Sequence, residues 1–366
     1  MENTDQKKSR RIKGRFRWII LLILAGNIIA VGVVSPIVMP HIQVPGETVF
    51  GPINLPLLGN FNITNTLIAI FITDLVLILM AISVRRATRR GELFLDGILG
   101  TVEMIIGGIY ELVESTNKKW ASHIFPWVAT IILLVVVANL INLIPGVETI
   151  GLIHEPHPGS PVPVYETEEL FSIGDFTVTT ITEEIEAGKI VEYNEGGSHQ
   201  VEVPGMGFVP FVRAGASDLN FTLALALVSV IMTQVLAVRA LGPRYFSKFI
   251  DFKRFGQMWT REKLGPFDLI MPFIDIFVGL LEMIAEFAKI LSFSFRLFGN
   301  IFAGGVLLAV IGTIVPVLVP SVFYVLELFV GVIQALVFGI LTLVFMSMAT
   351  QGHDEHEQQK ELAGSY

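Results

Sequence analysis

The sequence predicts an all-α, polytopic membrane protein, and three observations support this class. Hydrophobic residues make up 52% of the 366 residues, charged residues only 16%, and the mean hydropathy is +0.67. A soluble chain of 40.3 kDa needs far more charge on its surface. The apolar residues gather in blocks of roughly 20, the length at which a helix crosses a hydrocarbon core of about 30 Å. Because there is no cysteine, disulfides, thiol catalysis and cysteine-ligated metals are excluded.

Six apolar stretches are expected to cross the membrane. They run at about Trp18–Val38, Thr66–Val84, Phe125–Leu143, Phe221–Val238, Phe267–Val315 and Val319–Ala349. Basic residues precede the first stretch, as in a cleaved signal peptide. That stretch ends in Ser35-Pro36 without a clear small-x-small site, so a retained anchor helix is favoured.

Basic residues divide the connecting segments between the two sides of the membrane. The N-terminus to Arg17, the segment Arg85–Lys119 and the loop Arg239–Lys263 hold 20 of the 25 Lys and Arg. Met39–Asn65 holds none and Pro145–Asn220 only two. The positive-inside rule places the three basic segments in the cytoplasm. With six crossings both termini are cytoplasmic, and we expect a bacterial plasma (inner) membrane.

Two segments differ from the apolar stretches. The segment from Arg85 to Thr116 is amphipathic, which predicts a helix along the cytoplasmic interface with its arginines among anionic head groups. The outer insert Val147–Gly215 has 12 acidic residues against two basic ones. Within it, GKIVEYNEGGSHQVEVPG (188–205) predicts a small β-hairpin around its Gly-Gly turn. A solvated cap is favoured for this insert, and a docking surface for an outer partner is the alternative.

The fifth stretch is too long for one perpendicular span, since its 49 residues would measure roughly 73 Å as a helix. Two spans would need a turn, but no Gly/Pro cluster or charge run interrupts it between Pro272 and Pro316. We therefore expect one long oblique helix, followed by an antiparallel return helix. The resulting parts are a basic tail and anchor helix (1–40), membrane helices with the interfacial helix (41–145), the acidic insert (146–216), a membrane core (217–350) and a polar cytoplasmic tail (351–366).

Ionisable residues inside a membrane are costly, so those of the fifth stretch are functional candidates. At about 100° per residue, Glu282, Glu286, Lys289, Arg296 and Asn300 share one stripe of the helix. Such a stripe has to face protein or water. Snorkelling of Arg296 and a structural ion pair between Glu286 and Lys289 are the alternatives.

The return helix offers a matching polar face. Glu327 and Gln334 are seven residues apart, so they lie one above the other. A prolyl turn centred on Val315–Pro316 brings Arg296 beside Gln334 and Gly305 opposite Glu327.

The motifs around Arg296 are specific. Arg296 opens RLFGNIFAGG, preceded by SFSF and followed across the hairpin by GVIQALVFGILTLVFMSMA. With NLINLIP at Asn139–Pro145 and SDLNFTLALAL at Ser217–Leu227, the chain from about Asn62 to Ala349 resembles subunit a of the F-type ATP synthase membrane sector.

The resemblance implies a stator subunit in which Arg296 faces a rotating ring of c subunits between two offset half-channels. The residues it marks for ion translocation are Arg296, Gln334, Asn300, Glu282, Lys289, Asn139, Asn142, Asp218 and Asn220. Two further candidates do not come from the family pattern, namely Glu327 from the hairpin register and Ser292 on the cytoplasmic side of Arg296. The implied partners are the c-subunit ring, the peripheral-stalk b subunits, the rest of the synthase and the lipid bilayer. No catalytic residue, cofactor, metal or nucleic acid is implied for this chain. Whether the ion is H⁺ or Na⁺ depends on the ring carboxylate, which this chain does not contain.

Two departures from the family pattern limit the resemblance. Many members have an acidic residue directly after the Ala-Gly pair, where this chain has Gly305, and the acid at Glu327 is interpreted as its replacement on the facing helix. The basic N-terminal helix and the long acidic insert exceed the usual pattern, so no role is transferred to them.

Two other classes of function fit the sequence less well. A secondary transporter commonly shows internal repeats, and the two halves of this chain show none. A membrane hydrolase would need a metal site in the tail HDEH (His353–His356), which is a weak pattern without HExxH, a P-loop or GxSxG.

The predicted topology is testable by labelling. A membrane-impermeant reagent should reach a label site introduced at Glu183 from outside intact cells, and should not reach one at Lys253. Labelling of Lys253 alone would reverse the orientation.

Overall fold

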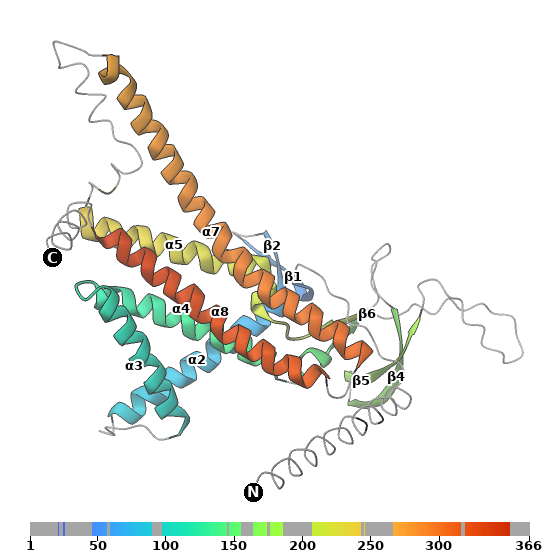
Figure 1. The fold of residues 1–366 in the computed structure, drawn as a ribbon. Coiled ribbons are helices and arrows are strands. Elements are labelled where there is room, and N and C mark those ends of the chain that lie inside the picture. The colour runs from blue at the N-terminus through green and yellow to red at the C-terminus, as the bar shows by residue number, and fades with distance from the viewer. Residues whose placement is uncertain are drawn as a thin grey trace, which may run out of the picture. The chain divides into compact units, whose positions relative to one another are not determined.

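The computed structural model describes residues 21, 25, 46–56, 59–89, 97–144, 146–154, 164–173, 176–185, 207–242, 245, 266–315 and 319–351. Its helices are α2 (Asn65–Arg89), α3 (Ile98–Thr116), α4 (Ala121–Asn142), α5 (Leu219–Leu241), α7 (Pro266–Ile314) and α8 (Val319–Thr350), as Figure 1 shows. Five of them (α2, α4, α5, α7 and α8) are long and apolar enough to cross a membrane. The polytopic, mostly helical class is therefore confirmed. The predicted anchor helix Trp18–Val38 lies outside the described residues, apart from residues 21 and 25.

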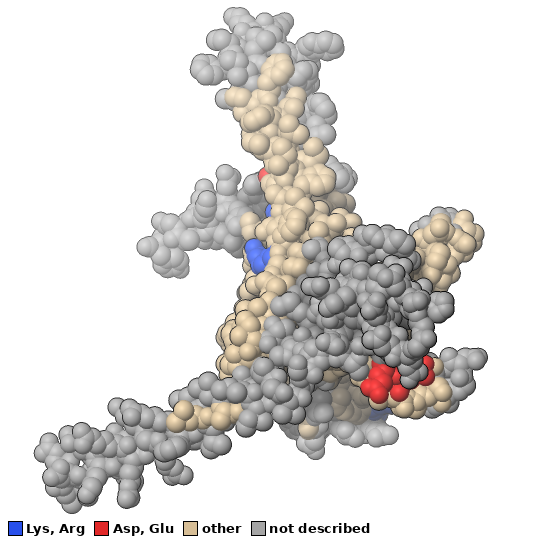
Figure 2. Space-filling view, turned by 90° about the vertical axis from the view of Figure 1, so that its right-hand side faces the viewer, with Lys and Arg blue, Asp and Glu red and all other residues tan. Residues whose placement is uncertain are grey.

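The surface agrees with this class. On the face drawn in Figure 2, the described residues are mostly uncharged, and basic and acidic side chains form only small areas. Large apolar side chains on the spanning helices are widely exposed, including Phe71, Phe287 and Phe329 at 60%, 64% and 62%. Exposed apolar surface of this extent suits lipid or protein rather than water.

The fifth stretch forms one unbroken helix, as predicted. Helix α7 runs for 49 residues without interruption. The tilt of α7 in a bilayer stays a prediction.

The segment Arg85–Thr116, predicted as one interfacial helix, belongs to two helices in the structure. Helix α2 continues to Arg89, so Arg85, Arg86 and Arg89 belong to the end of a spanning helix rather than to the interfacial one. The physical reason is that nothing in ISVRRATR stops a helix, and cations are favourable at a helix C-terminus. Helix α3 follows separately from Ile98, and it buries Ile109 and Val113 against α4.

Among the described residues, the strands form three two-stranded antiparallel sheets. In the insert, β4 (Val164–Ile173) pairs with β5 (Phe176–Ile185), and β3 (Gly151–His154) pairs with β6 (Gly207–Pro210). A β-hairpin in the insert is thus confirmed, but it lies upstream of the predicted Gly-Gly turn, and residues 188–205 lie outside the described residues. The pair β1 (Thr48–Leu55) and β2 (Gly59–Thr64) was not predicted, because the Gly, Pro and Asn of β1 and β2 obscure the strand alternation.

The chain divides into two compact units. The insert unit comprises residues 1–68, 142–213 and 302–329, and the helical unit comprises residues 69–141, 214–301 and 330–366. In the helical unit, four helices share one core. Its buried members include Val135 of α4, Ala226 of α5, Phe293 and Leu297 of α7, and Phe338 of α8.

Close approach of α4 and α8 depends on a glycine. A Cβ placed on Gly339 would lie 2.2 Å from the Cγ1 atom of Ile132, so α8 packs here against a side chain that leaves no room. Glycine thus sets the separation of the two helices, as small residues commonly do in membranes.

We expect Gly339→Ala to destabilise the helical unit by about 1–3 kcal/mol, the usual cost of overpacking. Gly312→Ala is the control, because a Cβ on Gly312 meets no atom within 4 Å. Thermal unfolding of the purified protein in detergent measures both. Equal melting temperatures for the two variants would contradict the packing argument.

Candidate functional site

Arg296 lies on the uncovered face of α7. Its neighbours Phe293 and Leu297 point into the four-helix core, where they are 3% and 0% exposed. Core packing on that side leaves Arg296 and Ser292 exposed on the other. The guanidinium Nη2 donates a hydrogen bond to the Ser292 hydroxyl at 3.4 Å. Among the described residues, no carboxylate forms an ion pair with Arg296.

Gln334 pairs with Asn300 rather than with Arg296. The Asn300 Nδ2 donates to the Gln334 Oε1 at 2.8 Å. Gln334 therefore contacts a residue of α7 that is one helical turn beyond Arg296, its predicted neighbour. The prediction assumed that the axes of α7 and α8 are parallel and evenly spaced. Side chains as long as that of Gln334 can reach a residue one turn away. Gln334 itself is buried, at 4% exposed.

Three buried amide atoms of predicted site residues have no partner in the described part of the chain. They are the Gln334 Nε2 and the Oδ1 atoms of Asn139 and Asn142. Asn139 uses its other group, since its Nδ2 donates to the carbonyl of Gly331 at 3.2 Å. Buried polar atoms are normally hydrogen-bonded, so unpaired ones point to water or to a transient partner.

In the insert unit, Glu327 contacts Gly304 and not Gly305. A Cβ on Gly304 would lie 2.1 Å from the Glu327 Oε2, whereas one on Gly305 meets nothing within 4 Å. The predicted opposition of Gly305 and Glu327 is therefore wrong by one residue. One residue rotates a side chain by about 100° around its helix, which turns Gly305 away from α8. The Glu327 side chain is partly buried, and no described residue forms a hydrogen bond or ion pair with it.

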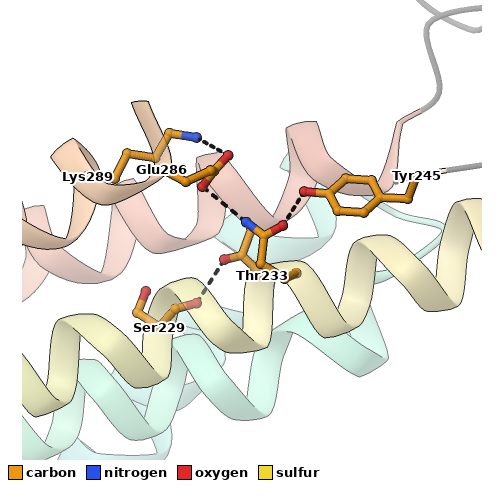
Figure 3. A network of polar contacts seen from close by, with 6 residues as sticks. Ser229, Thr233, Tyr245, Glu286 and Lys289 are labelled. Carbon is orange, nitrogen blue, oxygen red and sulfur yellow. Dashed lines mark hydrogen bonds and ion pairs between the residues drawn. The ribbon is translucent and has the colours of Figure 1, made fainter. Parts of the chain in front are cut away.

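A polar network joins α5, α7 and the loop after α5, as Figure 3 shows. The Lys289 ammonium donates to the Glu286 Oε1 at 2.8 Å, and Gln234 Nε2 donates to the Glu286 Oε2 at 3.0 Å. The Tyr245 hydroxyl donates to the Gln234 Oε1. Lys289 also lies 4.7 Å from the ring centroid of Phe345 on α8, within cation–π distance. The Glu286–Lys289 contact that was weighed as a structural ion pair is therefore present.

The remaining predicted residues lie apart from this network or at its edge. Asp218 is buried and caps α5, because its side chain accepts from the backbone N–H of Asn220 at 2.9 Å. The Asn220 side chain is exposed, and Glu282 is partly buried on α7. Glu282 lies near enough to Tyr245 to influence its ionisation.

Two residues of the network were missed in the sequence. Gln234 was visible as a single amide within the apolar run of α5, which is the signal that could have marked it. Tyr245 follows α5 in a basic loop, and nothing in its immediate sequence indicates that it turns back to a helix.

Tyr245 is an unusually weak acid. Burial, together with the negative charges of Glu286 and Glu282, raises the pKa of Tyr245 from 10.0 to about 12, and the hydrogen bond to Gln234 opposes the shift. The phenol therefore remains a hydrogen-bond donor at neutral pH. Because the folded chain holds this proton more tightly than the unfolded chain, its contribution to stability is full below pH 10 and is lost as the pH rises through about 12.

Phenolate absorbance tests this assignment. We expect the titration difference between the wild type and Tyr245→Phe to show one tyrosine of the six ionising near pH 12. A difference curve centred near pH 10.0 would contradict the buried, negatively charged surroundings.

The sequence of this chain is similar to proteins of one family. The family model for the ATP synthase A chain matches residues 66–347. The chain is similar to ATP synthase subunit a of Mycobacterium bovis, with 31% identity over 170 residues, which are 45% of this chain and 56% of that protein. It is also similar to ATP synthase subunit a of Campylobacter jejuni, with 32% identity over 152 residues, which are 41% of this chain and 59% of that protein. The aligned part thus spans somewhat more than half the length of these relatives. Since the family model covers most of the chain, this multi-pass membrane protein belongs to the ATP synthase A chain family.

Proposed function

We propose that this chain is the stator subunit a of a rotary F-type ATP synthase, and that it couples ion flow through the membrane to rotation of a c-subunit ring and to ATP synthesis. The observation that carries the proposal is the position of Arg296. It is a permanent cation on the exposed face of a spanning helix, and no carboxylate among the described residues neutralises it. A counter-charge from another chain would satisfy it.

An arginine suits this contact for a chemical reason. Its guanidinium stays charged at every working pH, whereas a lysine in an apolar setting can lose its proton. A ring carboxylate would be ionised while it passes Arg296 and neutral while it faces lipid. The same cation would repel an ion that moved directly between the two half-channels.

The outer half-channel would be lined by Glu327 and by polar groups on several helices. The unpaired amide atoms of Asn139, Asn142 and Gln334 support this assignment, because each can hydrogen-bond to passing water. Asn300 holds Gln334 in place. Asp218 and Asn220, at the start of α5, complete the set proposed for this path.

The cytoplasmic half-channel would use the other end of the stripe on α7. Glu282 and Lys289 lie toward the predicted cytoplasmic side, and Ser292 lies between them and Arg296 in the sequence. Lys289 is 27% exposed, so it has access to solvent or to a neighbouring chain. We propose H⁺ as the ion, with Na⁺ as the alternative that the ring carboxylate site would decide.

The proposed setting is a bacterial plasma (inner) membrane with both termini cytoplasmic. A membrane potential supplies a driving free energy of about 2.3 kcal/mol per charge per 100 mV. Because this free energy drives the ions, the proposed role of the chain is to conduct them and not to catalyse a covalent reaction. Peripheral-stalk b subunits would hold it against the torque of the ring.

Replacing Arg296 tests the central role. We expect Arg296→Ala and Arg296→Lys to abolish ion-driven ATP synthesis in membrane vesicles, with the complex still assembled. Arg239→Ala is the matched control, since Arg239 is also an exposed arginine but lies in the last turn of α5. Near-normal synthesis by the Arg296→Ala complex would disprove the proposal.

Glu327 provides a second test with two glycine variants. Glu327→Gln should slow proton pumping strongly because an amide cannot titrate, and Glu327→Asp should retain part of the rate. Gly304→Ala should also slow pumping, because its Cβ would occupy the position of the Glu327 carboxylate. Gly305→Ala is its control and should pump normally, since its Cβ meets no atom within 4 Å. Equal pumping by the Gly304→Ala and Gly305→Ala variants would contradict the assignment of Glu327 to the outer half-channel. Normal pumping by an assembled Glu327→Gln complex would contradict it as well.

A further inference from the structure

Asp74 is a carboxylate in the middle of the spanning helix α2, outside the set of residues proposed for ion translocation. It lies in α2 nine residues after Asn65 and eleven before Arg85, which is about 14 Å and about 16 Å along the axis. With those two polar ends at the membrane surfaces, Asp74 is close to the bilayer centre. Ionisable side chains at this depth normally face protein and are paired.

Asp74 has no polar partner among the described residues. Its side chain is exposed, and no described residue donates a hydrogen bond or forms an ion pair to it. Helix α2 packs through its other side, where Thr66, Ala69 and Thr73 are buried at 2%, 5% and 1% exposed. Only 11% of the spanning window of α2 is buried, against 44% for α4.

Exposed apolar side chains surround the carboxylate on one face of α2. Phe71, Ile78 and Ile82 are 60%, 56% and 40% exposed. At about 100° per residue, these three lie within roughly 80° of Asp74 around the helix. This face of α2 is therefore apolar apart from one carboxylate. It is complementary to the apolar face of a second helix that carries one basic side chain.

We propose that this face of α2 is the docking surface for a membrane-spanning helix of another chain, which places a lysine or arginine against Asp74. Charge complementarity decides the occupant. The apolar run Trp18–Val38 of this chain contains no Lys, Arg or His, so it offers no cation. A second copy docked through the same face in a two-fold dimer would bring Asp74 against Asp74, and two like charges repel.

The docking surface does not depend on the proposed role of Arg296, since α2 carries none of the residues assigned to ion translocation. The two assignments can therefore succeed or fail separately.

Photo-crosslinking in the assembled complex, in native membranes, tests the proposal. A photoreactive amino acid is introduced at Ile78, beside Asp74, or at Val76, which is 40% exposed but lies about 160° away around the helix. We expect severalfold more protein adduct from Ile78, and mass spectrometry should assign it to a helix with a basic residue in its apolar run. Adducts with lipid alone, with residues 18–38 of this chain or with a second copy would overturn the proposal.

Charge variants of Asp74 give the second measurement. Asp74→Lys and Asp74→Leu should both lose the crosslinked partner from the purified complex, while Asp74→Glu retains it. Asp74→Leu is included because Asp74→Lys could lose the partner simply by preventing membrane insertion of α2. The leucine makes α2 more apolar, so this variant should insert normally. Changing the partner's basic residue to Asp should restore its recovery with Asp74→Lys. Full recovery of the partner with Asp74→Leu, or no restoration by the paired reversal although both chains insert, would contradict the proposal.

Discussion

A charge within a membrane needs a counter-charge, and this requirement organises the structure around Arg296. Removing an ion from water is costly, and the guanidinium cannot escape that cost by losing its proton. Within the described residues only the Ser292 hydroxyl reaches it. In the proposed function, another chain supplies the missing counter-charge on this exposed face of α7.

The four-helix core fixes the direction in which that charge points. Leu297 and Phe293, on either side of Arg296 in the sequence, are buried between α4, α5 and α8. Rotating α7 to bury the guanidinium would expose both of them. Polar contacts between helices add to this constraint, since the hydroxyls of Thr222 and Ser294 lie 3.0 Å apart, and those of Ser229 and Thr342 lie 2.9 Å apart. The position of the cation is thus set by packing on the opposite side of its helix.

Hydropathy and charge predicted most of the fold, because spanning helices satisfy their own backbone and depend little on distant residues. The five described spans and the unbroken α7 follow from that rule. Contacts between helices were harder to predict. An even hairpin register placed Gln334 by Arg296 and Glu327 by Gly305, but the structure pairs them with Asn300 and Gly304. Tyr245 was missed because it lies beyond the end of α5, where helical periodicity does not predict its contact with Gln234.

The central claim is that the counter-charge of Arg296 comes from a ring of partner subunits. Disulfide crosslinking measures this directly, because the chain has no cysteine of its own and a single one can be introduced at Phe295, which is 54% exposed beside Arg296. A second cysteine is placed next to the carboxylate in the membrane helix of the c subunit. The account predicts a disulfide between the two chains in the assembled complex. No disulfide at Phe295, with efficient crosslinking of the same c-subunit cysteine to another face of this chain, would contradict it.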